Sequence, residues 1–203
     1  MKRRALILAF CAVPLMSWAD EAATPDKPIT ALNNALLKIM HSGKKVAFAE
    51  RSAVLRPVVE KVFDLPLLLR NSVGNVRWPS IPEDQKTALL DLFTQFTVAS
   101  YVANFDDFNG EKFVITPDTR KVENDIVVPT RIVASNGDIT KLDYVMRQTD
   151  GQWRVVDILL DGSISRVAVT RSDFRALLAP ADASKLVDSL RTKVANLAAG
   201  KPA

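Results

Sequence analysis

The chain has 203 residues, of which 48% are apolar and 25% are charged, with a formal net charge of +4. This length and composition are typical of one globular domain with a sizeable core and exclude a collagen-like or low-complexity chain. The charge is too small, and too concentrated near the start of the chain, to indicate nucleic-acid binding.

The first nineteen residues resemble a secretory signal peptide. Residues 2–4 form a basic head, an apolar run of about a dozen residues follows, and Ser-Trp-Ala at 17–19 provides small residues for cleavage. The run is too short to span a bilayer, which argues against an uncleaved anchor. We expect cleavage after residue 19, a periplasmic location, and a single mature domain at 20–203.

Removal of this segment changes the charge and the cysteine content. It contains three of the 27 basic residues and none of the 23 acidic ones, so the mature chain has a net charge of +1. The single cysteine, Cys11, leaves with it, and the bulky Phe10 argues against a lipoprotein cleavage site. A secreted chain without cysteine has no disulfides and depends on burial for its stability.

Helical periodicity dominates the first half of the mature chain. Apolar residues recur at helical spacing from Ile29 to a stop at Gly43, and again over 48–63, where Pro57 lies inside the pattern. Asp64 is typical of an N-cap for a short helix that ends before Gly74. A capping box at 80–83 predicts a long helix that continues to about Phe105.

Alternation then replaces helical spacing. Four strands are predicted at 112–116, 125–134, 140–148 and 152–160, with Asn-Gly and Asp-Gly turns between the last three. This pattern predicts an antiparallel meander, in which Pro129 requires a bulge or an unpaired stretch. Two more helices, at 164–178 and 181–198, complete an α+β fold of about six to seven helices over a four-stranded sheet.

The last predicted strand carries the main structural expectation. Strict alternation places Arg154, Val156, Ile158 and Leu160 on one face and Trp153, Val155, Asp157 and Leu159 on the other. Both faces are mostly apolar, so we expect both to be covered. The cover is either helices or a molecule from outside the chain, which would occupy an apolar cavity between sheet and helices.

Catalytic groups are scarce in the mature chain. His41, the only histidine, lies near a predicted helix end, where it suits the helix dipole better than catalysis. Zinc sites of the Cys/His type and phosphate-binding glycine loops cannot be assembled, and a Ser-His-Asp or Cys-His arrangement would have to rely on His41. Asp157 remains: as a perturbed general base, with Tyr144, it would serve a small pocket enzyme, but a helix cap or an ion pair is the favoured role.

Several segments together resemble the MlaC, or toluene-tolerance, family, and most of all its hopanoid-associated HpnM branch. The similarity covers roughly 29–190. It rests on Leu55-Arg56-Pro57-Val58-Val59, Phe63-Asp64, Arg70, Val73-Gly74, Trp78, Phe96 to Tyr101, Trp153-Arg154-Val155-Val156-Asp157, Asp161-Gly162, Ser165, Arg171 and Phe174. The turn at 161–165 departs from the usual Gly-Val-Ser of the family, which leaves the ligand open between a phospholipid and a hopanoid or other polycyclic lipid.

The resemblance implies a non-enzymatic periplasmic shuttle with no cofactor, no metal and no nucleic-acid partner. It would act as a monomer that carries lipid between an inner-membrane ABC transporter with an MCE-type subunit and an outer-membrane lipoprotein complex. A periplasmic adaptor without ligand is a further alternative. We predict that eleven residues line the lipid cavity: Trp78, Leu92, Phe93, Phe96, Tyr101, Leu142, Tyr144, Met146, Ile158, Leu160 and Ile164.

Overall fold

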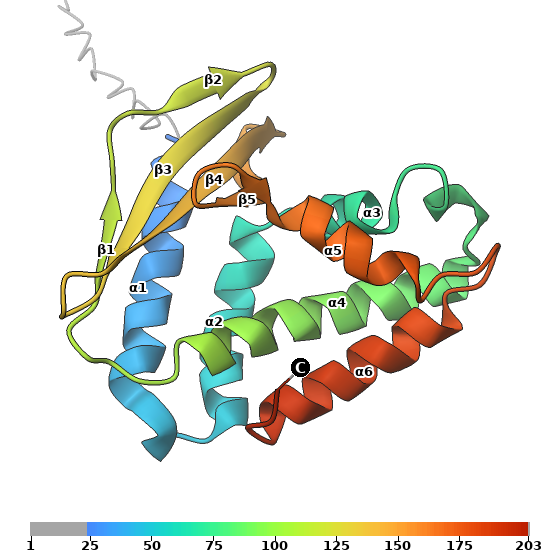
Figure 1. Cartoon of the computed structure of the whole chain (residues 1–203), viewed down its shortest axis with the longest axis horizontal. Helices are drawn as coiled ribbons and strands as arrows, with labels where there is room; N and C mark the ends of the chain where they lie inside the picture. Colours follow the sequence, from blue (N-terminus) through green and yellow to red (C-terminus); the bar gives the residue numbers. More distant parts are fainter. Residues whose placement is uncertain (1–23, 203) are drawn as a thin grey trace, which may run out of the picture.

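A computed structural model describes residues 24–202 and shows helices packed against an antiparallel sheet (Figure 1). The expected signal peptide lies outside the described residues. Within 24–202 there are six α-helices, which confirms the α+β class: α1 (Asp26–Ser42), α2 (Phe48–Val62), α3 (Leu65–Val73), α4 (Glu83–Asn104), α5 (Arg166–Arg175) and α6 (Ser184–Ala198). Two short 3-10 helices, η1 (Gly43–Lys45) and η2 (Trp78–Ser80), connect them.

Helix α3 begins and ends where its sequence predicts. The side chain of Asp64 accepts a hydrogen bond from the Leu67 amide at 3.1 Å, with proline in the first turn. Gly74 follows the helix at a φ of +97°, a conformation that favours glycine. The capping box predicted for α4 is wrong. Ser80 donates to the carbonyl of Arg77 instead, and α4 begins at Glu83 without a side-chain cap.

The sheet has six strands in the described range, not the four predicted. They are β1 (Lys112–Ile115), β2 (Arg120–Val122), β3 (Asp125–Val133), β4 (Ile139–Thr149), β5 (Gln152–Leu160) and β6 (Ile164–Ser165). Their order is β1-β3-β4-β5-β6, with β2 also paired to β3, and every pairing is antiparallel. The meander of the three long strands is confirmed, whereas the short β2 and β6 were missed.

Pro129 lies opposite a gap between two strands. On that side of β3, β1 ends at the partner of Thr130 and β2 begins at the partner of Val127. The carbonyl of Pro129 accepts from the Thr116 amide at 2.9 Å, so its nitrogen, which carries no hydrogen, faces the same gap. Pro129 therefore lies outside the strand pairings on this side, as predicted, whereas on the other side it pairs with Asp143 of β4.

A β-bulge in β5 overturns the two-faced pattern predicted for this strand. Val145 pairs with Asp157 but Met146 pairs with Val155, so Val156 is an extra residue and the alternation shifts there. Trp153, Val155, Ile158 and Leu160 consequently share one face, and Gln152, Arg154, Asp157 and Leu159 share the other. The strand is apolar on one face and largely polar on the other, as in an ordinary antiparallel sheet.

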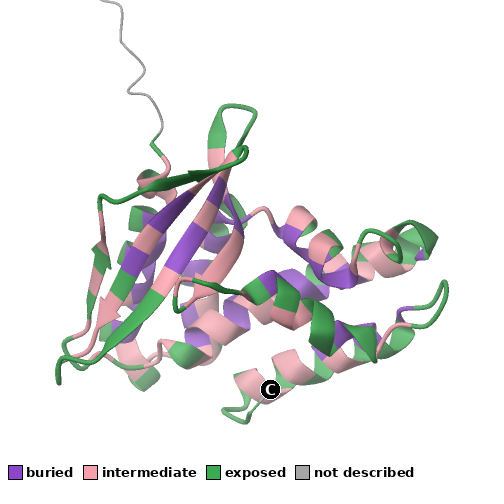
Figure 2. Ribbon diagram, turned by 45° about the horizontal axis from the view of Figure 1, so that its top comes forward, coloured by how far each residue is buried: buried purple, intermediate pink, exposed green. Residues whose placement is uncertain are grey.

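The helices cover only the apolar face of the sheet. Val128, Tyr144, Met146 and Val155 lie on that face and belong to the same buried core as the helices. The opposite face carries ion pairs, among them Arg147 with Asp125, at 2.7 Å for both guanidinium nitrogens. Figure 2 shows exposed and intermediate residues interrupting the buried ones across the sheet. The expectation that both faces need cover is therefore wrong.

Candidate functional site

A pocket of about 610 Å3, here called the main pocket, lies between the sheet and the helices. Its lining includes Phe93, Phe96, Thr97, Ser100, Tyr101 and Asn104 from α4, and Leu142, Ile158 and Leu160 from β4 and β5. Leu68 and Ser72 of α3 and Arg166, Val167 and Thr170 of α5 complete a further wall. Five elements, α3, α4, β4, β5 and α5, therefore meet around one space.

Aromatic rings form two groups of contacts along the α4 side of the main pocket. Tyr101 contacts Phe63 at 5.8 Å between ring centroids and Phe105 at 6.0 Å, and Phe105 in turn contacts Phe113. At the other end Phe93 meets the ring of Phe174 edge-on at 6.4 Å. Such offset and edge contacts hold the rings in place, so this wall is rigid as well as apolar.

The main pocket also has a polar part. Asp106, Asp107, Asn109 and Glu111, which follow α4, belong to its lining, as does Arg166 at the start of α5. Lys44 pairs with Asp106 at 3.0 Å. The apolar side chains of α4, β4 and β5 and these charged groups together give the pocket an amphipathic lining. Such a lining suits a ligand with a hydrocarbon part and a polar part.

Two tyrosines, the buried Tyr144 and the half-buried Tyr101, connect the pocket wall with the sheet core. Burial raises the pKa of Tyr144 to about 12, and the hydrogen bond with Tyr101 lowers this pKa by a smaller amount. Burial raises the pKa of Tyr101 still more clearly, and Tyr144 adds to the rise. Both phenols therefore stay neutral at physiological pH, and neither provides a proton acceptor.

Asp157 lines the main pocket, yet its carboxylate is occupied by helix α5. Oδ1 accepts from the amides of Ile158 at 2.8 Å and Val167 at 3.1 Å, and Oδ2 accepts from the hydroxyl of Ser165 at 2.5 Å. The favoured structural role, a carboxylate that caps helix amides, is confirmed. Tyr144 pairs with Ile158 and Asp157 pairs with Val145, so alternation places the proposed catalytic pair on opposite faces.

Six of the eleven predicted lining residues lie in the main pocket. They are Phe93, Phe96, Tyr101, Leu142, Ile158 and Leu160. Their contact with lipid stays a prediction. The correct placement on α4 follows from helical spacing, and that on β4 and β5 follows from the pairing of Leu142 with Leu160.

The other five predicted residues lie elsewhere. Tyr144 and Met146 are buried in the core, 3% and 0% exposed, because helices pack directly on them. Leu92 precedes Phe93 by one residue and is turned away by about 100°. Trp78 lies in η2 under the ammonium of Lys86, and Ile164 of β6 is half exposed at the sheet edge.

Several residues that line the main pocket were not predicted from the sequence. Thr97, Ser100 and Asn104 continue the α4 stripe at helical spacing from Phe93, so periodicity could have identified them despite their polarity. Ser72 and Thr170 had no such signal, because they reach the pocket through the packing of α3 on α5. Within 24–202 no group of three or more His, Cys, Asp or Glu side chains is placed to hold a metal ion.

The protein has the architecture of a pocket-containing α+β domain. One layer of helices covers one face of an antiparallel sheet, and an amphipathic pocket lies between them. The model of the MlaC protein family matches residues 30–192. The chain therefore belongs to the MlaC family, as its sequence motifs predict.

A solved structure from Ralstonia solanacearum has a similar fold. It is described as a phospholipid-binding protein in complex with a phospholipid, and it matches with a TM-score of 0.73 at 18% sequence identity. The match covers 87% of this chain and 99% of the other. At this identity the likeness establishes a shared fold. A comparison with curated proteins found no match.

Between residues 24 and 202, no helix is both long enough and apolar enough to cross a bilayer.

Proposed function

We propose that the main pocket binds the hydrocarbon tail of a phospholipid or related lipid, and that the protein carries this lipid through the periplasm. The observation that carries the proposal is the amphipathic pocket, in which aromatic rings from α4 face aliphatic side chains of β4 and β5. Membership of the MlaC family supports it, as does the phospholipid bound by the structurally similar Ralstonia protein.

The size of the pocket is adequate for a lipid tail. Its volume of about 610 Å3 lies within the range of about 300–1,000 Å3 that is usual for small-molecule pockets.

The energetics suit a carrier better than a tight binder. Burial of one methylene is worth about 0.8 kcal/mol relative to water, but a methylene in a bilayer is already dry. Transfer from bilayer to pocket therefore has a small net free energy, and the lipid can move in either direction. Hydrogen bonds occupy the carboxylate of Asp157, and Tyr144 is neutral, so these two residues do not form the acid–base pair of the enzymatic alternative, and we propose a carrier without enzymatic activity.

The route and the membrane partners are part of the same proposal. The lipid would come from, or go to, an inner-membrane ABC transporter with an MCE-type subunit, with an outer-membrane lipoprotein complex at the other end. A polycyclic lipid such as a hopanoid is the alternative cargo. Its rigid rings need a wider space than a flexible tail. Identification of the bound lipid distinguishes a hopanoid cargo from a phospholipid cargo.

Native mass spectrometry of gently isolated protein tests the proposal. We expect a population with the added mass of one lipid, and extraction of that lipid identifies its class. Protein that carries no lipid, and that also takes up none from phospholipid vesicles after mild delipidation, would contradict the proposal. A hopanoid mass would preserve the carrier function and change the cargo.

A further inference from the structure

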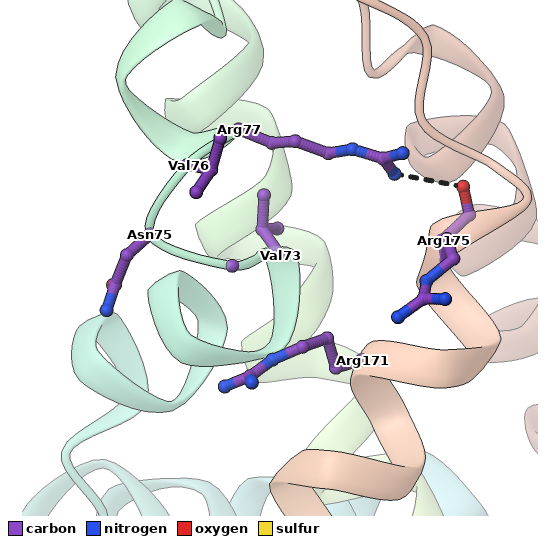
Figure 3. Close-up of a pocket in the computed structure, with 7 residues that line it drawn as sticks. Val73, Asn75, Val76, Arg77, Arg171 and Arg175 are labelled. Carbon is purple, nitrogen blue, oxygen red and sulfur yellow. Dashed lines mark hydrogen bonds between the residues drawn. The ribbon is translucent and has the colours of Figure 1, made fainter.

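A second cavity, of about 560 Å3, lies across the α3–α5 contact from the main pocket and is here called the arginine cleft. Its lining comprises Val73, Gly74, Asn75, Val76 and Arg77, together with Arg171 and Arg175 of α5 (Figure 3). Neighbouring residues divide between the two cavities, since Ser72 and Thr170 line the main pocket. The packed helices therefore separate an amphipathic pocket from a basic cleft.

Two of the three arginines are held in place by backbone carbonyls. Arg77 donates from Nη1 to the carbonyl of Arg175 at 3.1 Å, and Arg171 donates from Nε to the carbonyl of Asn71 at 2.7 Å. Figure 3 shows Arg77 crossing from the loop after α3 to the end of α5, while Arg171 extends from α5 toward α3. Each guanidinium uses one donor nitrogen in this way and keeps the other donors for a ligand.

The cleft has an excess of positive charge. No Asp or Glu side chain pairs with Arg77, Arg171 or Arg175 in the part of the chain that the structure describes. The carboxyl ends of α3 and α5 each contribute about half a negative charge, so three guanidinium groups leave an excess of about +2. Capping of these two helix ends therefore explains only part of the arrangement.

We propose that the arginine cleft binds a phosphate group. Guanidinium groups match phosphate oxygens with paired donors, and three arginines line this one cavity. The phosphate can belong to free phosphate or to a phospholipid headgroup at a bilayer surface. Val76, 93% exposed at the edge of the cleft, would contact the apolar layer only in the second case.

The site is tested on the mature, delipidated protein by NMR titration with inorganic phosphate. Arg175→Gln is the first variant, because its side chain makes no hydrogen bond within 24–202 and its loss leaves α5 intact. Arg171→Gln/Arg175→Gln is the second. The control is Arg131→Gln/Arg154→Gln on the outer sheet face, which removes the same charge.

We expect phosphate to shift the amide signals of Gly74 and Asn75 in the wild type and the control. The affinity should fall on the order of tenfold in the Arg175 variant, and further in the double variant, because charge-assisted hydrogen bonds are lost. Lipid uptake into the main pocket should be unchanged in the Arg175 variant and in the control, because neither change touches the hydrogen bond of Arg171 that joins α5 to α3. Failure of this inference is thereby distinguished from failure of the proposed carrier function.

Vesicles distinguish the two sources of phosphate. If the headgroup is the ligand, the wild-type protein should sediment with phosphatidylcholine vesicles that contain phosphatidylglycerol, and salt should weaken this binding. The double arginine variant should no longer sediment with the vesicles, and Val76→Ser should sediment less. Binding of inorganic phosphate without vesicle binding assigns the cleft to free phosphate. The inference is overturned if neither probe binds, or if the double variant and the control bind equally.

Discussion

The hydroxyl of Ser165 donates a hydrogen bond to Asp157 at 2.5 Å, and its oxygen accepts from the amide of Ala168 at 3.0 Å. Ser165 is the N-cap of α5, and Asp157 also accepts from the Val167 amide. The carboxylate on β5 thus satisfies the first turn of α5 directly and through the serine. Because α5 forms a wall of the main pocket, this pair fixes the pocket wall to the sheet.

Asp157→Asn should lower the free energy of unfolding by about 1 kcal/mol and leave lipid uptake unchanged. The side-chain oxygen of the asparagine can still accept from the Val167 amide. The side-chain nitrogen that replaces Oδ2 cannot accept a hydrogen bond, so the Ser165 hydroxyl loses its acceptor. Urea unfolding measures the stability, and transfer from labelled vesicles measures the uptake. A variant of unchanged stability would contradict the capping role of Asp157.

A double-mutant cycle with Ser165→Ala separates the cap from other effects. If the two side chains act as one unit, the double variant should be destabilised by less than the sum of the single variants. Additive losses would mean that Asp157 stabilises α5 without the serine. The cycle uses the same urea transitions.

The β-bulge at Val156 leads to a prediction that strict alternation along β5 would not make. Val155 is 0% exposed in the core, whereas Arg154 lies on the outer face. Val155→Ala should therefore lower the free energy of unfolding by roughly 2 kcal/mol, and Arg154→Ala should change it by less than about 0.5 kcal/mol. Thermal and urea unfolding of both variants provide the comparison, and equal losses would contradict the observed register.

The same bulge explains how far the fold could be predicted. Turn residues and alternation located the three long strands, because the Asn-Gly and Asp-Gly pairs favour tight turns. A bulge leaves no comparable signal in Trp153–Val156, since every residue there is compatible with either face. The conclusion that both faces of β5 need cover was therefore wrong, although a pocket lies beside the strand.

The candidate site was predictable where one helix or one β-hairpin supplies it. Phe93, Phe96 and Tyr101 share a helix, so their common face follows from spacing. The walls from α3 and α5 depend on how two helices more than ninety residues apart pack together, for example through Arg171 and the Asn71 carbonyl. Local sequence patterns contain no information about that contact.

The two tyrosines predict a loss of stability at alkaline pH. Below pH 10, Tyr144 is protonated in both folded and unfolded chains. Between pH 10 and its folded pKa of about 12, only the unfolded chain releases the proton, so stability should fall by about 1.4 kcal/mol per pH unit. Urea unfolding at several pH values should give a shallower dependence for Tyr144→Phe, and parallel dependences would contradict the burial.

Tyrosinate absorbance provides an independent check of the same groups. The chain contains only two tyrosines, Tyr101 and Tyr144, so the signal has no other source. In the folded protein both should remain un-ionised at about pH 11, because burial raises both pKa values. Ionisation near the ordinary pKa of 10 while the far-UV circular dichroism is unchanged would show that the phenols are accessible to water.

Ser100→Trp should reduce lipid uptake severalfold by filling the main pocket. Ser100 lies on the pocket side of α4, and the larger side chain would occupy space between the aromatic wall and β5. Gln95→Trp is the matched control, because it places the same ring on the same helix outside the lining. Uptake is measured as the fraction of protein that carries lipid by native mass spectrometry after incubation with vesicles. Equal uptake by both variants, with both folded, would mean that the tail lies somewhere other than the main pocket.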